Sequence, residues 1–148
     1  MEDRHLCKAR PIGTRKQWVT GFYAVLGEKT VIIVNEPEKF YDVDSGKNSH
    51  GNKIVEVIPK TVCQCTGLKD KNGKLIWEND ILSGHIDDKF PEDETRKRVV
   101  WHENGWCTNE PSCDYYEELD DFDSENFEVI SNMIDNPELL KGVSYDGE

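Results

Sequence analysis

Short segments rich in β-branched and aromatic residues recur along the chain, and clusters of Asn, Asp, Gly and Ser separate them. This pattern predicts β-strands joined by tight turns. The clearest strand covers Gln17–Leu26, where apolar residues fill both alternating sets of positions and so predict burial on both faces. The other strands are expected at Thr30–Val34, Lys53–Pro59, Thr61–Leu68, Lys74–Glu78, Asp80–Ile86, Arg98–Glu103, Trp106–Thr108 and Phe127–Met133.

Asn-Gly dipeptides mark two of the turns. Asn72-Gly73 and Asn104-Gly105 each lie between predicted strands. This dipeptide favours the type I′ turn of a two-residue hairpin, because both central residues then need positive φ. Gly27-Glu28-Lys29 predicts a further tight turn, whereas residues 42–52 and 87–97 have the composition of longer loops.

One short helix is expected near the end of the chain. Asn136 suits the N-cap, Pro137 the first helical position, Glu138 the positive helix end and Gly142 the close. No amphipathic segment of about 10–15 residues separates the strands, which excludes a doubly wound α/β sheet and predicts an all-β barrel or roll. Residues 143–148 are expected to form a disordered tail.

Length and hydropathy narrow the class of protein. A chain of 148 residues suits one domain, or two small subdomains that share a core. Its longest aliphatic run is Val31–Val34. A membrane span needs about 20 apolar residues, and the first residues also lack the apolar stretch of a secretory signal. We therefore expect a cytoplasmic protein with no membrane association.

Charge is distributed unevenly. The net charge is −12, yet residues 1–109 hold 17 basic and 17 acidic residues, whereas residues 110–148 hold 13 acidic residues and one base. Such a chain repels phosphate backbones at long range, which disfavours nucleic-acid binding. The triplet Arg96-Lys97-Arg98 follows Asp93 and Glu94, which are expected to neutralise it.

The segment Asp114–Asp123 interleaves aromatic with acidic residues. One interpretation is a docking surface for a basic partner, with the acids in the place of DNA phosphates. The other is a solvated loop whose few aromatic side chains pack on the core. The candidate partner-binding residues are Tyr115, Tyr116, Glu117, Glu118, Asp120 and Asp121.

Five cysteines and four histidines raise the question of a metal site. Cys63 and Cys65 fall on one face of a strand. A zinc site can be drawn from that pair with other candidate ligands, namely Cys107, Cys113, His85 and His102. Structural zinc sites use tighter spacings such as CxxC. The alternative is that these cysteines are small buried hydrophobes, and we expect no bound metal or cofactor.

Motifs for catalysis are absent from the sequence. GxxxxGK[ST], GxGxxG, GxSxG and HExxH do not occur. Asp70-Lys71-Asn72-Gly73 imitates part of a calcium loop, but the flanking carboxylates are missing and a hairpin accounts for it. Trp77, Trp101 and Trp106 are expected to pack, the last two as a cross-strand pair, although aromatic residues on a small barrel also stack nucleotides. We therefore expect no catalytic residues.

One block is more specific than any of these features. Thr61–Ile81 reads TVCQCTGLKDKNGKLIWENDI and resembles the YopX family of phage and prophage proteins. Val99-Val100-Trp101 with Gly105, and the segment Phe127–Leu140 (FEVISNMIDNPELL), are similar to later family blocks in the same order. The likeness covers roughly residues 15–142. Asn79 and Ser131 stand where the family has glycine; Asn tolerates the left-handed backbone that a turn requires.

The resemblance implies a mainly β protein with an N-terminal β subdomain, residues 1–60, and a small SH3-like barrel, residues 61–142, followed by the tail. It implies a phage or prophage gene and no particular activity. Within the main block, Asp70 and Asp80 are expected to accept hydrogen bonds from backbone N–H groups at turns, rather than to act as a catalytic pair.

The function that follows is a non-enzymatic binding module that acts on a host or phage protein through the acidic surface. Two alternatives remain open. One is a nucleic-acid-associated barrel that uses Trp77 or Trp101, and the other is a small metal-dependent enzyme. Exposed strand edges also allow a homo-oligomer.

Overall fold

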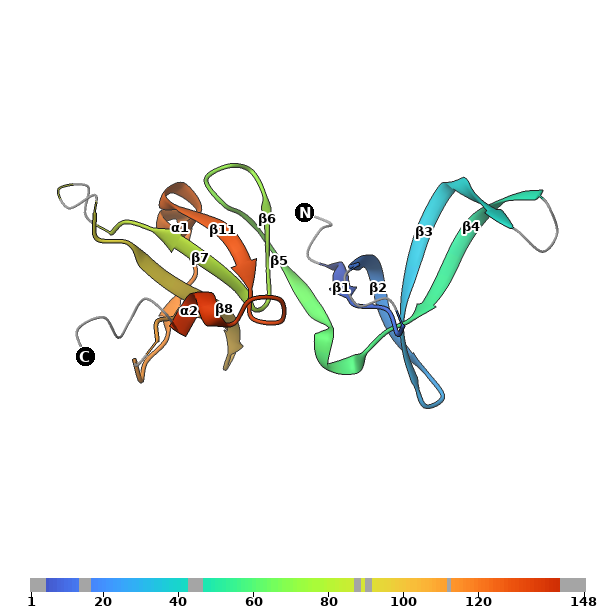
Figure 1. The fold of residues 1–148 in the computed structure, drawn as a ribbon, viewed down its shortest axis with the longest axis horizontal. Helices are drawn as coiled ribbons and strands as arrows, with labels where there is room; N and C mark the ends of the chain where they lie inside the picture. The colour runs from blue at the N-terminus through green and yellow to red at the C-terminus, as the bar shows by residue number, and fades with distance from the viewer. Residues whose placement is uncertain are drawn as a thin grey trace. The chain divides into compact units, whose positions relative to one another are not determined.

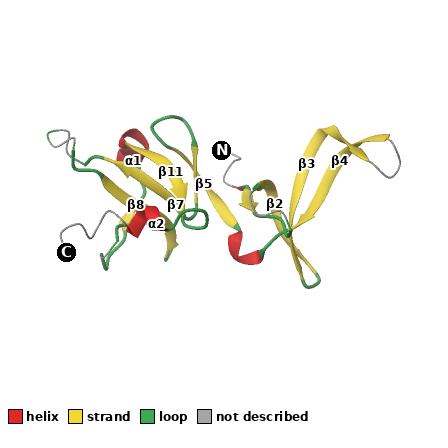
Figure 2. Ribbon diagram, in the orientation of Figure 1, coloured by secondary structure: helices red, strands yellow, loops and turns green. Residues whose placement is uncertain are grey.

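The computed structural model describes residues 5–13, 17–42, 47–86, 89, 92–111 and 113–141. These fall into two compact units, Glu2–Gln64 and Cys65–Glu148. Both are built from antiparallel β-strands with short helices, so the predicted mainly β class is confirmed (Figures 1 and 2). No helix in the part described is both long and apolar enough to span a membrane.

The N-terminal unit is a meander of strands with order β4-β3-β2-β1, to which the first residues of β5 add. Its core contains Ala9, Ile32 and Val57. A 3-10 turn at Pro59–Thr61 follows the last strand of the meander. The strands are β1 (Cys7–Ala9), β2 (Val19–Leu26), β3 (Lys29–Asp42), β4 (Lys47–Glu56) and β5 (Cys63–Lys69).

The β3–β4 hairpin is far longer than the sequence predicts. β3 continues from Lys29 to Asp42, and β4 begins at Lys47, inside the segment expected to be a loop. The expected loop was wrong for residues 47–52, which pair with β3, for example Asn48 with Tyr41, while residues 43–46 lie outside the described residues. A ladder of N–H and C=O groups needs no apolar side chains to form.

Burial of both faces of β2 was also wrongly predicted. β1 pairs with β2 only as far as Gly21, so the rest of β2 extends past its short neighbour. Four of the apolar side chains beyond that point are exposed: Phe22, Tyr23, Val25 and Leu26. β3 pairs with this part of β2, but a paired strand in the same sheet does not cover the side chains on either face, which are buried only where a second layer packs on them.

The C-terminal unit holds a five-stranded sheet with order β10-β9-β8-β7-β11. Ile76, Leu82, Val99, Leu119 and Phe127 form its core. No closed barrel is found among the residues described, and the SH3-like likeness stays a prediction. The strands are β6 (Leu75–Trp77, paired with β5), β7 (Asp80–Gly84), β8 (Thr95–His102), β9 (Gly105–Asn109), β10 (Glu117–Glu118) and β11 (Phe127–Asn132).

Both Asn-Gly hairpins are present, but neither has the predicted turn. In the first, Gly73 N–H donates to Asp70 O at 2.9 Å, so Lys71 and Asn72 are central and only Gly73 has positive φ, +85°. In the second, His102 pairs with Gly105 and Glu103 has φ +60°. Each turn is displaced by one residue from the dipeptide, because the register of the strands fixes which residues must turn.

Two short helices complete the unit. The expected one is α2 (Glu138–Lys141), and the residue expected to close it lies outside the described residues, as does the predicted tail. The other, α1 (Asp121–Asn126), was not expected. Asp120 and Asp123 form a reciprocal capping box at its start. That Asp-x-x-Asp spacing is the signal in the sequence that an interpretation as an acidic loop overlooked.

Candidate functional site

The acidic strip, which we define as Asp114–Asp123, borders two adjoining hollows. The larger has a volume of about 370 Å³, and its lining consists of Ile86, Lys97, Glu117, Glu118, Asp120, Phe122 and Asp123. The smaller has a volume of about 10 Å³, and its lining consists of Thr108, Glu110, Cys113, Tyr115 and Glu117. Glu117 lines both, so the edge strand β10 separates them.

The structure places the six predicted binding residues along this border in different environments. Glu117 and Glu118 are exposed and form β10, opposite Thr108 and Cys107 of β9. Four of the six line one of the hollows, namely Tyr115, Glu117, Glu118 and Asp120. Tyr116 and Asp121 line neither.

Hydrogen bonds and ring contacts hold the strip in place. Asn109 Nδ2 donates to the backbone oxygens of Cys113 at 3.3 Å and Tyr115 at 3.0 Å. The Tyr116 ring stacks on His102, with 3.9 Å between ring centroids. These contacts attach the strip to β8 and β9, while most of its side chains stay exposed, and both interpretations of the strip remain open.

A buried ion pair forms part of the lining of the larger hollow. Lys97 Nζ lies 2.5 Å from Asp123 Oδ1, and the two residues are only 4% and 2% exposed. The ammonium group also lies 4.4 Å from the centre of the Phe127 ring. Lys97 and Asp123 neutralise each other, and among the described residues no basic side chain forms an ion pair with the other acids of the lining: Glu117, Glu118 and Asp120, the last of which caps α1.

The sequence did not single out the apolar part of this lining. Phe122 is 44% exposed and Ile86 is 59% exposed. Phe122 lies on α1, and its ring also makes an edge contact with Phe127 of the core, at 6.3 Å between centroids. An apolar surface beside carboxylates suits a ligand that has both apolar and cationic groups.

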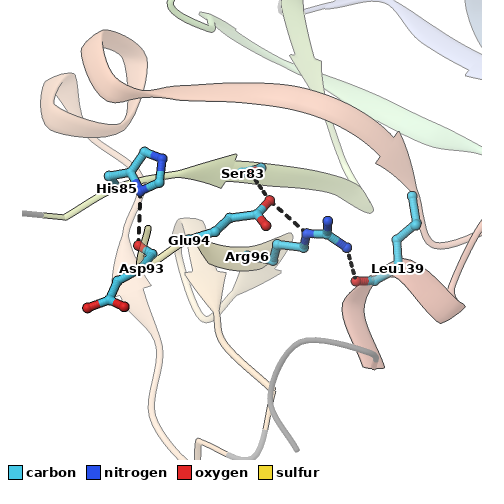
Figure 3. Close-up of polar contacts among 6 residues, drawn as sticks. All are labelled: Ser83, His85, Asp93, Glu94, Arg96 and Leu139. Carbon is cyan, nitrogen blue, oxygen red and sulfur yellow. Dashed lines mark hydrogen bonds and ion pairs between the residues drawn. The ribbon is translucent and has the colours of Figure 1, made fainter. Parts of the chain in front are cut away.

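A second polar cluster, drawn in Figure 3, contains serine, histidine and acidic residues but lacks the arrangement of a catalytic triad. Ser83 donates to Glu94 rather than to His85, whose Nδ1 lies 3.0 Å from the backbone oxygen of Asp93. Hydrogen bonds from Arg96 and then Ser83 hold the pKa of Glu94 below its usual value, which makes it a weak general base.

The same cluster has a structural role. Arg96 Nε donates to Glu94 at 2.9 Å, and its Nη1 donates to Leu139 O at 2.8 Å (Figure 3). Leu139 belongs to α2, so the arginine joins that helix to β8. The prediction that neighbouring acids neutralise the basic triplet is therefore right for Arg96 and wrong for Lys97, whose partner is Asp123.

The carboxylates of the main sequence block stabilise turns, as predicted. Asp70 Oδ1 accepts from the N–H groups of Asn72 and Lys74, and Oδ2 accepts from Val129, each at 2.9 Å. Burial alone raises the pKa of Asp70, but these hydrogen bonds outweigh it and lower the pKa. Asp80 Oδ2 accepts from Trp77 N–H at 2.7 Å.

None of the five cysteines forms a disulfide. Cys63 and Cys65 are buried, and Cys63 Sγ donates to Thr61 O at 3.4 Å. Burial, together with the Glu118 and Glu103 carboxylates, raises the pKa of Cys107, so this thiol is a weak nucleophile near neutral pH. Within the described ranges, no three His, Cys, Asp or Glu side chains are placed to hold a metal ion.

The tryptophans pack as expected. Trp77 is buried. Trp101 and Trp106 are register partners on β8 and β9, and their rings meet edge to face with centroids 5.0 Å apart. The predicted cross-strand pair is therefore confirmed, although Trp101 keeps one side exposed.

Comparison with known proteins places the chain in a family. The family model described as YopX protein matches residues 25–141. No curated protein matches the chain. The matched range includes most of the described strands, the hairpin that Asp70 organises and the whole acidic strip. The chain therefore belongs to the YopX family.

Proposed function

We propose that this protein is a non-enzymatic binding module of phage or prophage origin that engages a host or phage protein in the bacterial cytoplasm. The observation that carries the proposal is the larger hollow. Three acids that form no ion pair with a described residue and two exposed apolar side chains line it: Glu117, Glu118, Asp120, Ile86 and Phe122.

The chemistry of this lining favours a basic protein segment. Carboxylates attract lysine and arginine, while exposed apolar side chains contact the methylene or aromatic parts of a peptide. Phosphate-rich nucleic acid would be repelled. β10 lies at the edge of its sheet, where a bound segment has access to unpaired backbone groups. An SH3-like arrangement of the meander β7-β8-β9-β10 is part of this proposal.

The test is a capture experiment from bacterial lysate with three forms of the tagged, full-length protein, each treated with nuclease. The first form is wild type. The second carries Glu117→Lys, Glu118→Lys and Asp121→Lys, which spare the Asp120 cap and the buried Asp123. The control carries Glu92→Lys, Glu103→Lys and Glu138→Lys, three exposed acids that line neither hollow.

The two variants change the net charge equally. Comparing them therefore distinguishes the effect of a local binding site from the effect of the total charge. We expect the wild type and the control to enrich the same protein, and the strip variant to lose it without a fall in its thermal stability. Capture by the strip variant at the wild-type level would refute the proposal. Equal loss from both variants would show bulk electrostatic attraction instead of a site.

A further inference from the structure

The smaller hollow contains a buried hydroxyl group that no described residue satisfies. Thr108 is 1% exposed, and its Oγ1 has no hydrogen-bond partner among the described residues. Thr108 is paired with Val99 on one side and Glu117 on the other. Buried polar atoms are nearly always hydrogen-bonded, so this one indicates a group that enters from outside.

The size and charge of the hollow limit what that group is. A volume of about 10 Å³ holds a single group the size of one water molecule. Glu110 and Glu117 line the same space and favour a cation. A lysine ammonium is a compact charge with three donors, whereas the guanidinium of arginine is a planar fork and too large.

We propose that this hollow receives the ammonium group of a lysine side chain from the bound protein, so that the site prefers lysine over arginine. This inference rests on the proposed function and names the chemistry of its partner. Thr108, Glu110 and Glu117 are the lining residues that carry side-chain oxygens other than a phenol, and the proposal assigns them as acceptors for the ammonium group. Cys113 and Tyr115 complete the lining and offer contact for the methylene stem.

The preference is measurable with two labelled peptides of equal length and charge, one with three consecutive lysines and one with three arginines between Gly and Ser residues. Fluorescence anisotropy with the full-length protein gives both dissociation constants. We expect the lysine peptide to bind about fivefold more tightly, the change that one hydrogen bond of ordinary strength makes to a dissociation constant.

Substitutions at Thr108 assign the preference to its hydroxyl group. Thr108→Val keeps the shape and removes the hydroxyl, so it should abolish the preference and leave binding of the arginine peptide unchanged. Thr108→Ser keeps the hydroxyl and should retain the preference. Thermal unfolding without peptide should show Thr108→Val at least as stable as wild type, because it removes an unsatisfied group.

The outcomes separate this inference from the proposed function. Equal binding of both peptides, unchanged in Thr108→Val, would refute the lysine pocket and leave the acidic surface standing. Binding of neither peptide would count against both. A clear loss of stability in Thr108→Val without peptide, with Thr108→Ser unaffected, would overturn the inference in favour of one structural water in the hollow.

Discussion

Single carboxylates determine much of the local structure in the C-terminal unit. Asp70 is buried and accepts three backbone N–H groups, two from its own hairpin and one from Val129, 59 residues further along the chain. It therefore fixes the turn and also attaches the turn to β11. Asp80 and Asp120 satisfy N–H groups at other turns and ends in the same way.

Acid should weaken the protein partly through Asp70. Its pKa is lower in the folded state, so its stabilising contribution is complete above the unfolded value of about 3.9 and is lost as pH falls through the folded value. Asp70→Asn should cost about 1–3 kcal/mol at pH 7, because an amide cannot accept on both sides. Urea unfolding at pH 7 and at about pH 3 measures both effects. An unchanged difference between wild type and variant at the two pH values would contradict the assignment.

The sequence allowed the turn carboxylates to be predicted but not the buried ion pair. Asp70 and Asp80 act within a few residues of themselves, so their motif is enough. Lys97 has acids nearby in sequence, yet it pairs with Asp123 across the fold. Thr108 and Phe122 are likewise ordinary residues in the sequence, and only packing makes one unsatisfied and the other exposed at the hollow.

At the scale of elements, the turn between β6 and β7 depends on one left-handed residue. Asn79 has φ +73°, its N–H donates to Val99 O at 2.8 Å, and its carbonyl accepts from Met133 N–H at 2.8 Å. The turn therefore joins β8 to the chain after β11. Asn tolerates this backbone conformation better than other residues with a Cβ.

The free energy of unfolding of Asn79 variants should depend on how much strain the positive φ imposes on the new residue. Asn79→Gly should leave the free energy of unfolding within about 0.5 kcal/mol of the wild-type value, because glycine adopts positive φ without strain. Asn79→Val should lower it by about 1–3 kcal/mol, because a β-branched residue is strained there. Chemical denaturation of both variants checks the order. Equal loss in both would show that the Asn side chain, and not the backbone, matters.

Hairpins and helices could be predicted from the sequence where a few adjacent residues determine them. Hairpin positions followed from Asn-Gly, and α2 followed from Asn136-Pro137-Glu138. The long arms of β3 and β4 did not, because the many polar residues there lack the alternating apolar pattern of a strand, although their backbones pair. Ser131, where the resemblance places a glycine, follows a register shift in β11, and its hydroxyl donates to Asn136 at 2.6 Å.

At the scale of the whole molecule, the negative charge is concentrated in one of the two units. Glu2–Gln64 holds 10 basic and 8 acidic residues, whereas Cys65–Glu148 holds 8 basic and 22 acidic residues. Repulsion among like charges destabilises a compact state. The excess of acidic residues in the C-terminal unit should therefore lower its stability, a cost that the proposed binding role of the acidic strip would account for.

The repulsion among these acidic residues predicts that added salt stabilises the protein. Raising NaCl from about 0.01 M to about 1 M shortens the Debye length from about 30 Å to about 3 Å and screens the repulsion. The Tm should rise, by about 2–4 °C for each kcal/mol of repulsion removed in a chain of this length. Glu117→Gln, Glu118→Gln and Asp121→Asn together should raise the Tm at low salt and reduce its further rise. A Tm that falls with salt, or neutralised acids that destabilise the fold, would mean that the acidic strip is held by structural ion pairs, and its cost to stability would then no longer support a role in binding.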